Sequence, residues 1–460
     1  MGQLAETNDC DQQHRQALAG FKHGMIKRMK ISPFMFSREE KIKGKILILS
    51  QEIYPQVCIG GLGKFVAGIS HGMQDLGWET TVFLPENQNP VYLPYYLPEA
   101  KARSRTLVKK ALSWCCNHLW WPNWLWVQDW EGAYQAEVWR QQARGVSQSE
   151  TKIIWTIHSP LTTAGAGYNY GYQDFNQPDE PIDWGDDFFD FAALIEKGIS
   201  NVDLISTVSF SFARKLTRCE LFSQADQICG INNGIDSREW DPYHDKQISF
   251  CLKDSWPEFK LVNKRVLQRI FGLPQRNEPV FAFVSRLVPQ KGIDLLIEVL
   301  PGILAKNRIQ LIVVGQGLTR YQSFFARLKS DFPQKLGLCL QSEFRLPHQV
   351  FAGADFLILP SFSEPFGIVV AEARQYGVIP IVSDVDGLAD QVRNDIDGLT
   401  FETGNVNLLA GKIYEALRLF GSSSYWTLSS NGRNRVEDWL EIAARYEFYL
   451  AGADQQRYPS

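Results

Sequence analysis

The stretch from Lys45 to Phe65, KILILSQEIYPQVCIGGLGKF, places three glycines within four positions shortly after an apolar run. A dinucleotide-binding fold needs its G-x-G-x-x-G directly at the turn from strand to helix. Here nine residues separate the apolar run from Gly60, so the spacing excludes that kind of site. The pattern favours a loop that leaves the strand and returns as a helix starting near Gly60 or Gly61, whose free amide groups suit an anionic diphosphate. A turn that only reverses the chain is the alternative.

Short apolar runs alternate with helix-like segments outward from this stretch, and the series occurs twice. The runs cover residues 45–50, 80–85, 152–158 and 202–209, then 279–287, 309–317, 355–361 and 379–385. Apolar strands without clear alternation are buried on both faces, which indicates parallel sheets flanked by helices. We therefore predict an α/β fold of two Rossmann-like domains facing a cleft, with ligands at the carboxyl ends of the strands.

A polar, mixed-charge stretch around residues 240–278 separates the two series and is typical of a domain boundary. The last apolar segment has helical spacing and is free to pack anywhere, including against the first domain. The sequence thus predicts four parts: a leader that can be disordered (1–44), an N-terminal acceptor-side domain (45–250), a C-terminal nucleotide-sugar-binding domain (251–435) and a final helix (436–460).

Composition excludes several classes of protein. The 460 residues are 45% hydrophobic and 21% charged with a net charge of −4, which argues against a nucleic-acid-binding protein and a disordered chain. The eight cysteines form no CxxC pair, so a zinc ribbon is not expected and reduced thiols of a cytoplasmic protein fit best. We see no secretory signal and no apolar run of about 18 uncharged residues, the length a membrane span needs.

Two segments do not fit the alternating scheme. Residues 22–45 are basic, and residues 111–130, ALSWCCNHLWWPNWLWVQDW, contain six tryptophans. A basic arm with an aromatic belt would suit contact with a membrane surface. The alternative is a disordered leader followed by a helix and a strand that pack in the core.

Two carboxylates stand out in the second domain, in LPSFSEPFGIVVAEARQYG. Glu364 precedes an expected helix that has Phe366 and Gly367 in its first turn, and Glu372 follows within that helix. About 12 Å of helix separates the two carboxylates, so they can hold two hydroxyl pairs but not the same one. A nucleotide-sugar along the helix start would place its sugar near Glu364 and its ribose diol near Glu372. Its diphosphate would lie at four backbone amides, those of Phe366, Gly367, Ile368 and Val369.

Basic residues at strand ends can neutralise a departing diphosphate. Arg286 lies just past a strand, and Lys291 follows five residues later at a helix start. Such residues stabilise the charge that develops as a nucleotide leaves. A basic residue at a strand end is often only solvated, but together with the two glutamates and the strand-end glycine Gly315 this pair predicts one cleft.

These motifs resemble those of the GT-B nucleotide-sugar glycosyltransferases, and most closely the bacterial glycogen and starch synthase group. The matching stretches, in the order and spacing of that family, are GGLGKFVAGISHGMQDLGWETTVFLP, TIHSP, ISTVSFSFARKL, INNGIDSREWDP, VSRLVPQKGIDLLIEVLP and EPFGIVVAEARQYGVIPIVSDVDGLAD, between about residues 45 and 400. The resemblance implies transfer of glucose from ADP- or UDP-glucose, with retained α configuration and neither metal ion nor cofactor. A final helix that crosses back to the first domain is also implied.

The resemblance also implies roles for single residues. Arg286 and Lys291 match the diphosphate-binding pair, and Glu364 matches the glutamate that holds the transferred sugar. His158 matches the active-site histidine beside the anomeric centre, and Asn233 matches an asparagine near the donor sugar. No residue stands out as a carboxylate nucleophile, so we expect front-face departure in which the donor phosphate assists the acceptor hydroxyl.

The chain departs from the glycogen synthases at several positions. Cys58 and Lys64 stand where those enzymes typically carry Lys and Asp, Glu131 replaces a histidine, and Glu372 is typical of the broader retaining group. The expected acceptor is an α-glucan chain. Because of these departures, a small molecule, a lipid or a cell-surface polysaccharide is the alternative acceptor. A further alternative is a non-catalytic relative that binds a carbohydrate or a nucleotide. A metal-dependent transferase that uses Asp384–Asp386 as its metal motif is disfavoured, because such carboxylate triplets arise easily by chance.

Overall fold

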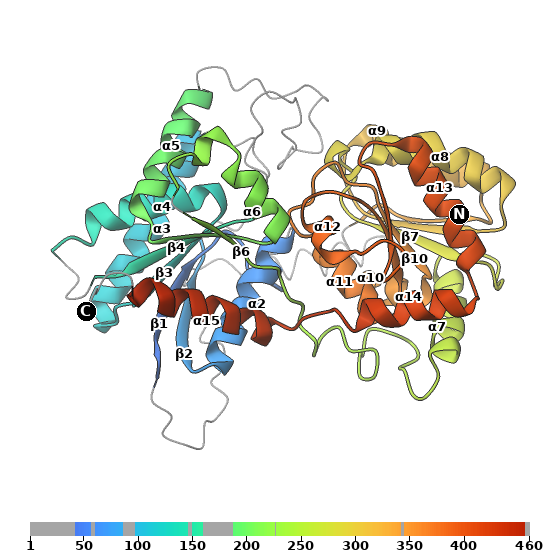
Figure 1. The fold of residues 1–460 in the computed structure, drawn as a ribbon, viewed down its shortest axis with the longest axis horizontal. Helices are drawn as coiled ribbons and strands as arrows, with labels where there is room; N and C mark the ends of the chain where they lie inside the picture. The colour runs from blue at the N-terminus through green and yellow to red at the C-terminus, as the bar shows by residue number, and fades with distance from the viewer. Residues whose placement is uncertain are drawn as a thin grey trace, which may run out of the picture. The chain divides into compact units, whose positions relative to one another are not determined.

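The computed structural model describes residues 42–56, 60–85, 97–145, 150–159, 187–225, 227–341 and 345–455. These residues belong to one compact unit, Arg38–Ser460. The unit contains two six-stranded parallel sheets (Figure 1). The predicted α/β class with two Rossmann-like halves is confirmed, whereas the exact domain boundaries remain predictions.

The first sheet has the strand order β2-β1-β3-β4-β5-β6, and the second has the order β12-β11-β10-β7-β8-β9. The strands of the first sheet are β1 (Gly44–Leu49), β2 (Trp78–Phe83), β3 (Trp124–Gln128), β4 (Lys152–Ile157), β5 (Leu204–Thr207) and β6 (Ile228–Gly230). Those of the second are β7 (Val280–Val284), β8 (Gln310–Val314), β9 (Leu336–Cys339), β10 (Phe356–Leu359), β11 (Ile379–Ser383) and β12 (Leu399–Phe401).

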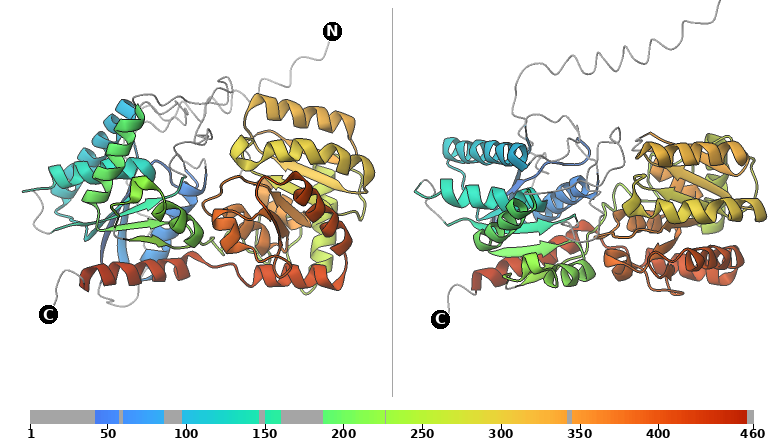
Figure 2. Two further views of the ribbon diagram at one scale, coloured as in Figure 1. Left: turned by 45° about the horizontal axis from the view of Figure 1, so that its top comes forward. Right: turned by 90° about the horizontal axis from the view of Figure 1, so that it is seen from above.

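Helices cover both faces of each sheet, as the two views of Figure 2 show. Those that accompany the first sheet are α2 (Gly61–Asp75), α3 (Leu97–His118), α4 (Asp129–Gln142), α5 (Asp187–Asn201), α6 (Phe210–Thr217), the 3-10 turn η1 (Glu220–Phe222) and α15 (Trp439–Gln455). The others are α7 (Trp256–Ile270), η2 (Pro289–Lys291), α8 (Ile293–Lys306), α9 (Thr319–Asp331), α10 (Leu346–Gly353), α11 (Ile368–Gln375), α12 (Asp386–Gln391), α13 (Val406–Leu419) and α14 (Ser423–Arg433).

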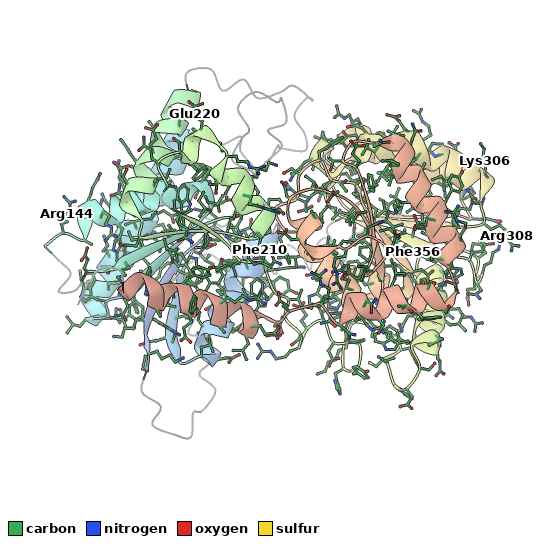
Figure 3. The ribbon with its side chains drawn as sticks, in the orientation of Figure 1. Arg144, Phe210, Glu220, Lys306, Arg308 and Phe356 are labelled. Carbon is green, nitrogen blue, oxygen red and sulfur yellow. The ribbon has the colours of Figure 1, made fainter. Side chains whose placement is uncertain are left out.

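The strands are apolar on both faces because each sheet lies between helices. Residues Ile46 to Leu49 of β1 are fully buried, as is Phe356 of β10, which lies inside the second half, whereas Lys306 and Arg308 lie at its edge (Figure 3). All eight predicted strands are present. The series did not include β3, β6, β9 and β12. The strand β3 lies in the tryptophan-rich stretch, β12 has only three residues, and a glycine interrupts the short apolar runs of β6 and β9.

Helix α15 packs on α2, beside the first sheet (Figure 1). Its residues Trp439 and Tyr446 share a buried cluster with Phe65 of α2 and Trp126 of β3. The chain therefore passes from the second sheet back to the first before it ends.

The tryptophan-rich stretch forms the end of α3 and the whole of β3. Trp124 and Trp126 are completely buried, and Trp120 is 7% exposed. The interpretation as a core-packed helix and strand is confirmed for this stretch. The leader lies outside the described residues up to position 41, so its membrane contact stays untested; no helix in the described ranges is long and apolar enough to span a membrane.

Candidate functional site at the carboxyl ends of the two sheets

The loop after β10 brings Glu364 to the carboxyl edge of the second sheet. Its side chain is buried and forms an ion pair with Lys291, which follows β7. The hydroxyl of Ser361 donates a hydrogen bond to the same carboxylate oxygen at 3.3 Å. Helix α11 begins at Ile368, two residues later than expected, because Gly367 adopts a left-handed conformation with φ of 89°. Two predicted site residues thus meet directly.

Lys291 and Arg286 form the positive side of this edge. Burial lowers the pKa of the Lys291 ammonium group, the Glu364 carboxylate opposes that effect, and the nearby Arg286 guanidinium lowers it further. Two cations close enough to repel each other are suited to an anion that carries more than one negative charge. The two predicted cations therefore lie close together at this edge, and their role in binding a diphosphate stays a prediction.

Helix α12 fixes the loop that carries Glu364 through hydrogen bonds. The carboxylate of Asp386 accepts hydrogen bonds from the Ser363 hydroxyl at 2.6 Å and the Glu364 backbone amide at 3.1 Å, and from the Lys215 ammonium group of α6 at 3.0 Å. Ser209, at the start of α6, donates to the backbone carbonyl of Pro365 at 2.6 Å. Asp386, weighed above as a metal ligand, thus ties the loop to the first half of the chain.

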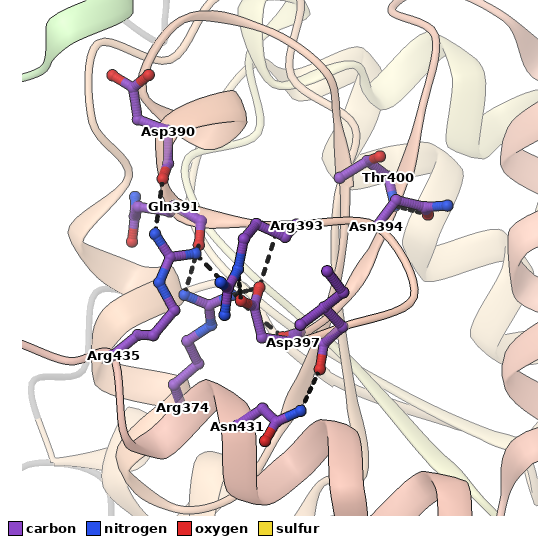
Figure 4. A network of polar contacts seen from close by, with 10 residues as sticks. Arg374, Asp390, Gln391, Arg393, Asn394, Asp397, Thr400, Asn431 and Arg435 are labelled. Atoms are coloured by element: carbon purple, nitrogen blue, oxygen red, sulfur yellow. Dashed lines mark hydrogen bonds and ion pairs between the residues drawn. The ribbon is translucent and has the colours of Figure 1, made fainter.

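A buried charge network supports the same loop (Figure 4). The Gln391 side chain donates hydrogen bonds to the carbonyls of Phe366 and Gly367. The backbone carbonyl of Gln391 accepts hydrogen bonds from Arg374 at 2.8 Å and Arg435 at 2.9 Å. These guanidinium groups, with that of Arg393, surround the fully buried Asp397 carboxylate. The backbone amides predicted to bind a diphosphate therefore stand on a fixed support.

His158 lies at the carboxyl end of β4 in the first half. Its Nε2 donates to the Gln128 side-chain oxygen at 2.9 Å, because a carboxamide oxygen only accepts. Burial lowers the pKa of the imidazole to about 3, so the ring is neutral near pH 7. The ring packs edge-on against Phe65 with centroids 4.6 Å apart. This tautomer leaves the Nδ1 lone pair as the acceptor.

Asp129 holds the His158 loop and was not singled out from the sequence as a site residue. Its carboxylate accepts from the Ser159 hydroxyl at 2.7 Å and from the amides of Ser159 and His158 at 3.0 and 3.3 Å. Burial raises the pKa of this carboxyl while those hydrogen bonds oppose the rise. Its position directly after a strand, and its φ of 53°, are the signals of a constrained functional position.

Glu131 lies buried near the same edge of the first sheet. Its carboxylate accepts from the Gln51 side chain and from Arg103, the latter at 3.4 Å. Burial raises the pKa of this carboxyl to about 7, and Arg103 opposes the shift. The position where the resembled family has a histidine therefore holds a carboxyl group that titrates near neutral pH.

The glycine loop starts α2 as predicted. Gly60 is the N-cap residue and Gly61 the first helical residue. The Gly60 amide donates to the Glu52 carboxylate at 3.3 Å. A side chain at Gly61 would meet the Ile368 methyl group at 3.3 Å, so the first turn of α2 lies against the start of α11. Cys58 lies outside the described residues.

The remaining predicted donor-binding residues occupy different surroundings. Asn233 is buried after β6, and its side-chain oxygen has no hydrogen-bond partner among the described residues. Gly315 packs against the Ser285 carbonyl, which a Cβ would approach to 1.8 Å, so packing alone requires a glycine there. Val369 is half-buried in α11, and Glu372, further along that helix, forms an ion pair with Lys64 of α2.

Comparisons with known proteins show which family the sequence resembles. A family model described as glycosyl transferases group 1 matches residues 267–435. Glycogen synthase 2 of Nitrosococcus oceani is 28% identical over 481 residues, which cover 87% of this chain and 96% of that protein. Glycogen synthase of Anaeromyxobacter dehalogenans is 31% identical over 344 residues, covering 71% of this chain and 72% of that one.

A solved structure shares the fold. The catalytic domain of starch synthase IV from Arabidopsis thaliana, bound to ADP and acarbose, superposes with a TM-score of 0.74 at 20% identity. The match covers 89% of this chain and 99% of that one. Because only 20% of the residues are identical, this similarity supports the fold and no specific function.

Proposed function

Because the chain belongs to the glycosyltransferase family of the bacterial glycogen synthases, we propose that it transfers glucose from ADP-glucose or UDP-glucose to the end of an α-1,4-glucan chain. The observation that carries this proposal is the Lys291–Glu364 ion pair beside Arg286, at the carboxyl ends of β7 and β10. Ligands of parallel α/β sheets bind at these ends. The pair supplies a cation for the diphosphate next to an acceptor for sugar hydroxyls.

In the proposed reaction, Arg286 and Lys291 bind the donor diphosphate and stabilise the charge that develops on it. Glu364 accepts hydrogen bonds from hydroxyls of the transferred glucose. The bond between the anomeric carbon and the diphosphate oxygen breaks, and a bond from the same carbon to the acceptor hydroxyl oxygen forms on the same face. The acceptor proton passes to the departing phosphate oxygen. The configuration at the anomeric carbon is therefore retained.

His158 acts on the first-sheet side of this reaction. Because its imidazole is neutral, it adds no positive charge that would compete for the diphosphate. Gln128 and Asp129 fix the ring and its backbone. The Nδ1 lone pair is left to accept a hydrogen bond from a hydroxyl of the bound sugar.

A donor and acceptor screen tests this proposal. ADP-, UDP- and GDP-glucose are each incubated with maltooligosaccharides or with a lipid extract, with and without EDTA, and products are separated by size. The proposal expects glucan elongation from ADP- or UDP-glucose that persists in EDTA. If glucose is transferred only to the lipid extract, the acceptor is a lipid and not a glucan. If elongation is lost in EDTA, a metal ion and not Arg286 and Lys291 neutralises the diphosphate.

A further inference from the structure

Lys64 joins the two halves of the chain at a buried carboxylate. Its ammonium group, in the fourth residue of α2, forms an ion pair with Oε1 of Glu372 in α11, 308 positions away. The Glu372 side chain is 4% exposed, whereas that of Lys64 is 29% exposed. A buried carboxylate whose partner comes from the other half of the chain depends on how those halves meet.

The surroundings of Lys64 fix the position of its ammonium group. It lies 5.2 Å from the ring centroid of Trp240, in the segment between the two sheets. That ring stacks on His348 of α10 with centroids 3.9 Å apart and planes 5° apart. Lys64 also stabilises the charge of Glu239, whose carboxylate accepts the Tyr54 hydroxyl hydrogen bond. The Trp240 ring and the Glu239 carboxylate thus hold the Lys64 ammonium group in place.

A positive charge at the position of Lys64, near the start of α2, is electrostatically unfavourable. The first turn of a helix favours negative charge, because the amide groups at the helix start leave partial positive charge there. The first turn of α2 has no acidic residue, and its fourth residue is a lysine. The Glu372 carboxylate offsets this unfavourable placement, so Lys64 is explained by what lies across from it.

We infer that Lys64 is a positioning residue for donor recognition, which orients the Glu372 carboxylate toward the ribose diol of the nucleotide. A carboxylate has two oxygens with about four acceptor positions. Lys64 contacts Oε1, and the remaining positions are left for two vicinal hydroxyls. This inference rests on the proposed function, because it assumes that a nucleoside diphosphate lies along α11.

The inference makes nucleoside recognition depend on both halves of the chain. Donor binding and the approach of α2 to α11 then stabilise each other, since each needs Glu372 in one orientation. Without Lys64 the carboxylate loses its cation in a buried position and turns away or takes up another partner. The expected defect is therefore specific to the ribose hydroxyls and spares the diphosphate contacts.

The test compares binding of a nucleoside diphosphate with that of its 2′,3′-dideoxy counterpart by calorimetry. The pair is built on ADP or UDP, whichever the full-length wild-type protein binds more tightly. The variants are Lys64→Met, Glu372→Gln and the double variant. Lys215→Met is the matched control, because Lys215 of α6 also pairs with a buried carboxylate of the second half, Asp386, away from Glu372.

For the wild type we expect the dideoxy nucleotide to bind at least tenfold more weakly. This ratio should fall at least threefold in Lys64→Met, reach about one in Glu372→Gln, and fall no further in the double variant. Lys215→Met should keep the wild-type ratio even if both affinities fall. General loss of packing lowers both affinities alike, so the ratio separates positioning from folding.

A wild-type ratio in Lys64→Met would overturn the inference, and so would an unchanged ratio in Glu372→Gln. Either result leaves the proposed function intact as long as ADP or UDP binds. If the wild type binds neither nucleotide, the proposed function is contradicted and this inference with it.

Discussion

Lys291 and Glu364 form a buried ion pair although 73 positions separate them in the chain. The pair forms because the loops after β7 and β10, neighbouring strands of the second sheet, end at the same edge. If Lys291 binds the donor diphosphate, its charge is needed most when the nucleotide leaves. We expect Glu364→Ala and Lys291→Ala each to lower the transfer rate by about a hundredfold or more.

Steady-state kinetics with the donor identified by the screen checks this expectation. Removing one member of a buried pair also destabilises the fold, so thermal unfolding with and without nucleotide is measured on the same samples. Near wild-type rates in both folded variants would show that the site is elsewhere.

The Asp397 network predicts a large loss of stability from a small change. Asp397→Asn keeps the shape of the side chain but leaves Arg374, Arg393 and Arg435 without their shared carboxylate. We expect the free energy of unfolding to fall by about 3–5 kcal/mol, as for other broken buried pairs. The control is Arg393→Met, whose side chain is 52% exposed, which should cost less than about 1 kcal/mol. Urea unfolding distinguishes the two; equal effects would mean that Asp397 is not the centre of the network.

Because of His348, we expect the free energy of unfolding to fall at high pH. Burial alone would lower the pKa of this histidine. A hydrogen bond to the Asp245 carboxylate at 2.8 Å and the Glu239 carboxylate 3.8 Å away outweigh that effect and raise the pKa from 6.5 to about 9. The folded state therefore binds the proton more tightly than the unfolded state. Its contribution, about 3 kcal/mol at most, is fully present below about pH 6.5 and is lost as the pH rises through about 9.

Unfolding free energies of the wild type and His348→Gln at pH 6, 7.5 and 9.5 check this sign. The difference between the proteins should be largest at pH 6 and should shrink toward pH 9.5. A difference that grows with pH would mean that the folded protein holds His348 neutral.

The packing of α15 on α2 depends on the absence of a side chain at Gly68. A Cβ there would lie 2.1 Å from the Trp439 indole nitrogen. Gly68→Ala should therefore displace α15 and lower the melting temperature by several degrees. Gly302→Ala in α8 is the control, because a Cβ there meets nothing within 4 Å and alanine favours helices by about 1 kcal/mol. Differential scanning calorimetry should find opposite shifts; a stable Gly68→Ala protein would contradict the described helix contact.

The longer strands and the first turn of α2 could be predicted because their signals are local. Runs such as Ile46–Leu49 are apolar on both faces, and Gly60–Gly61 follow at a helix start. The start of α11 was set slightly too early, since the left-handed conformation of Gly367 is not visible in the residue pattern. The short strands β6 and β9 gave no pattern because a glycine interrupts each of them, whereas β5 and β10, with four residues each, lie within longer apolar runs.

The site was only partly accessible from the sequence. Glu364 and Lys291 were assigned to one cleft from their strand-end positions, but their direct pairing was not foreseen. Lys64 was noticed only as a departure from a pattern, because its partner Glu372 lies 308 positions away. The supporting role of Asp386 was missed for the same reason, since its partner Lys215 lies 171 positions away. Contacts of this kind follow from the packing of distant elements and leave no periodic trace.

Incorporation of labelled glucose from ADP-glucose and UDP-glucose into a maltooligosaccharide of defined length measures the proposed transfer directly. Glucan elongation predicts products that are longer by one or more glucose units and are fully degraded by an α-1,4-specific amylase, with at least a hundredfold less product from Glu364→Ala. Release of free nucleotide and glucose without longer chains, or chains formed equally well by Glu364→Ala, would contradict it.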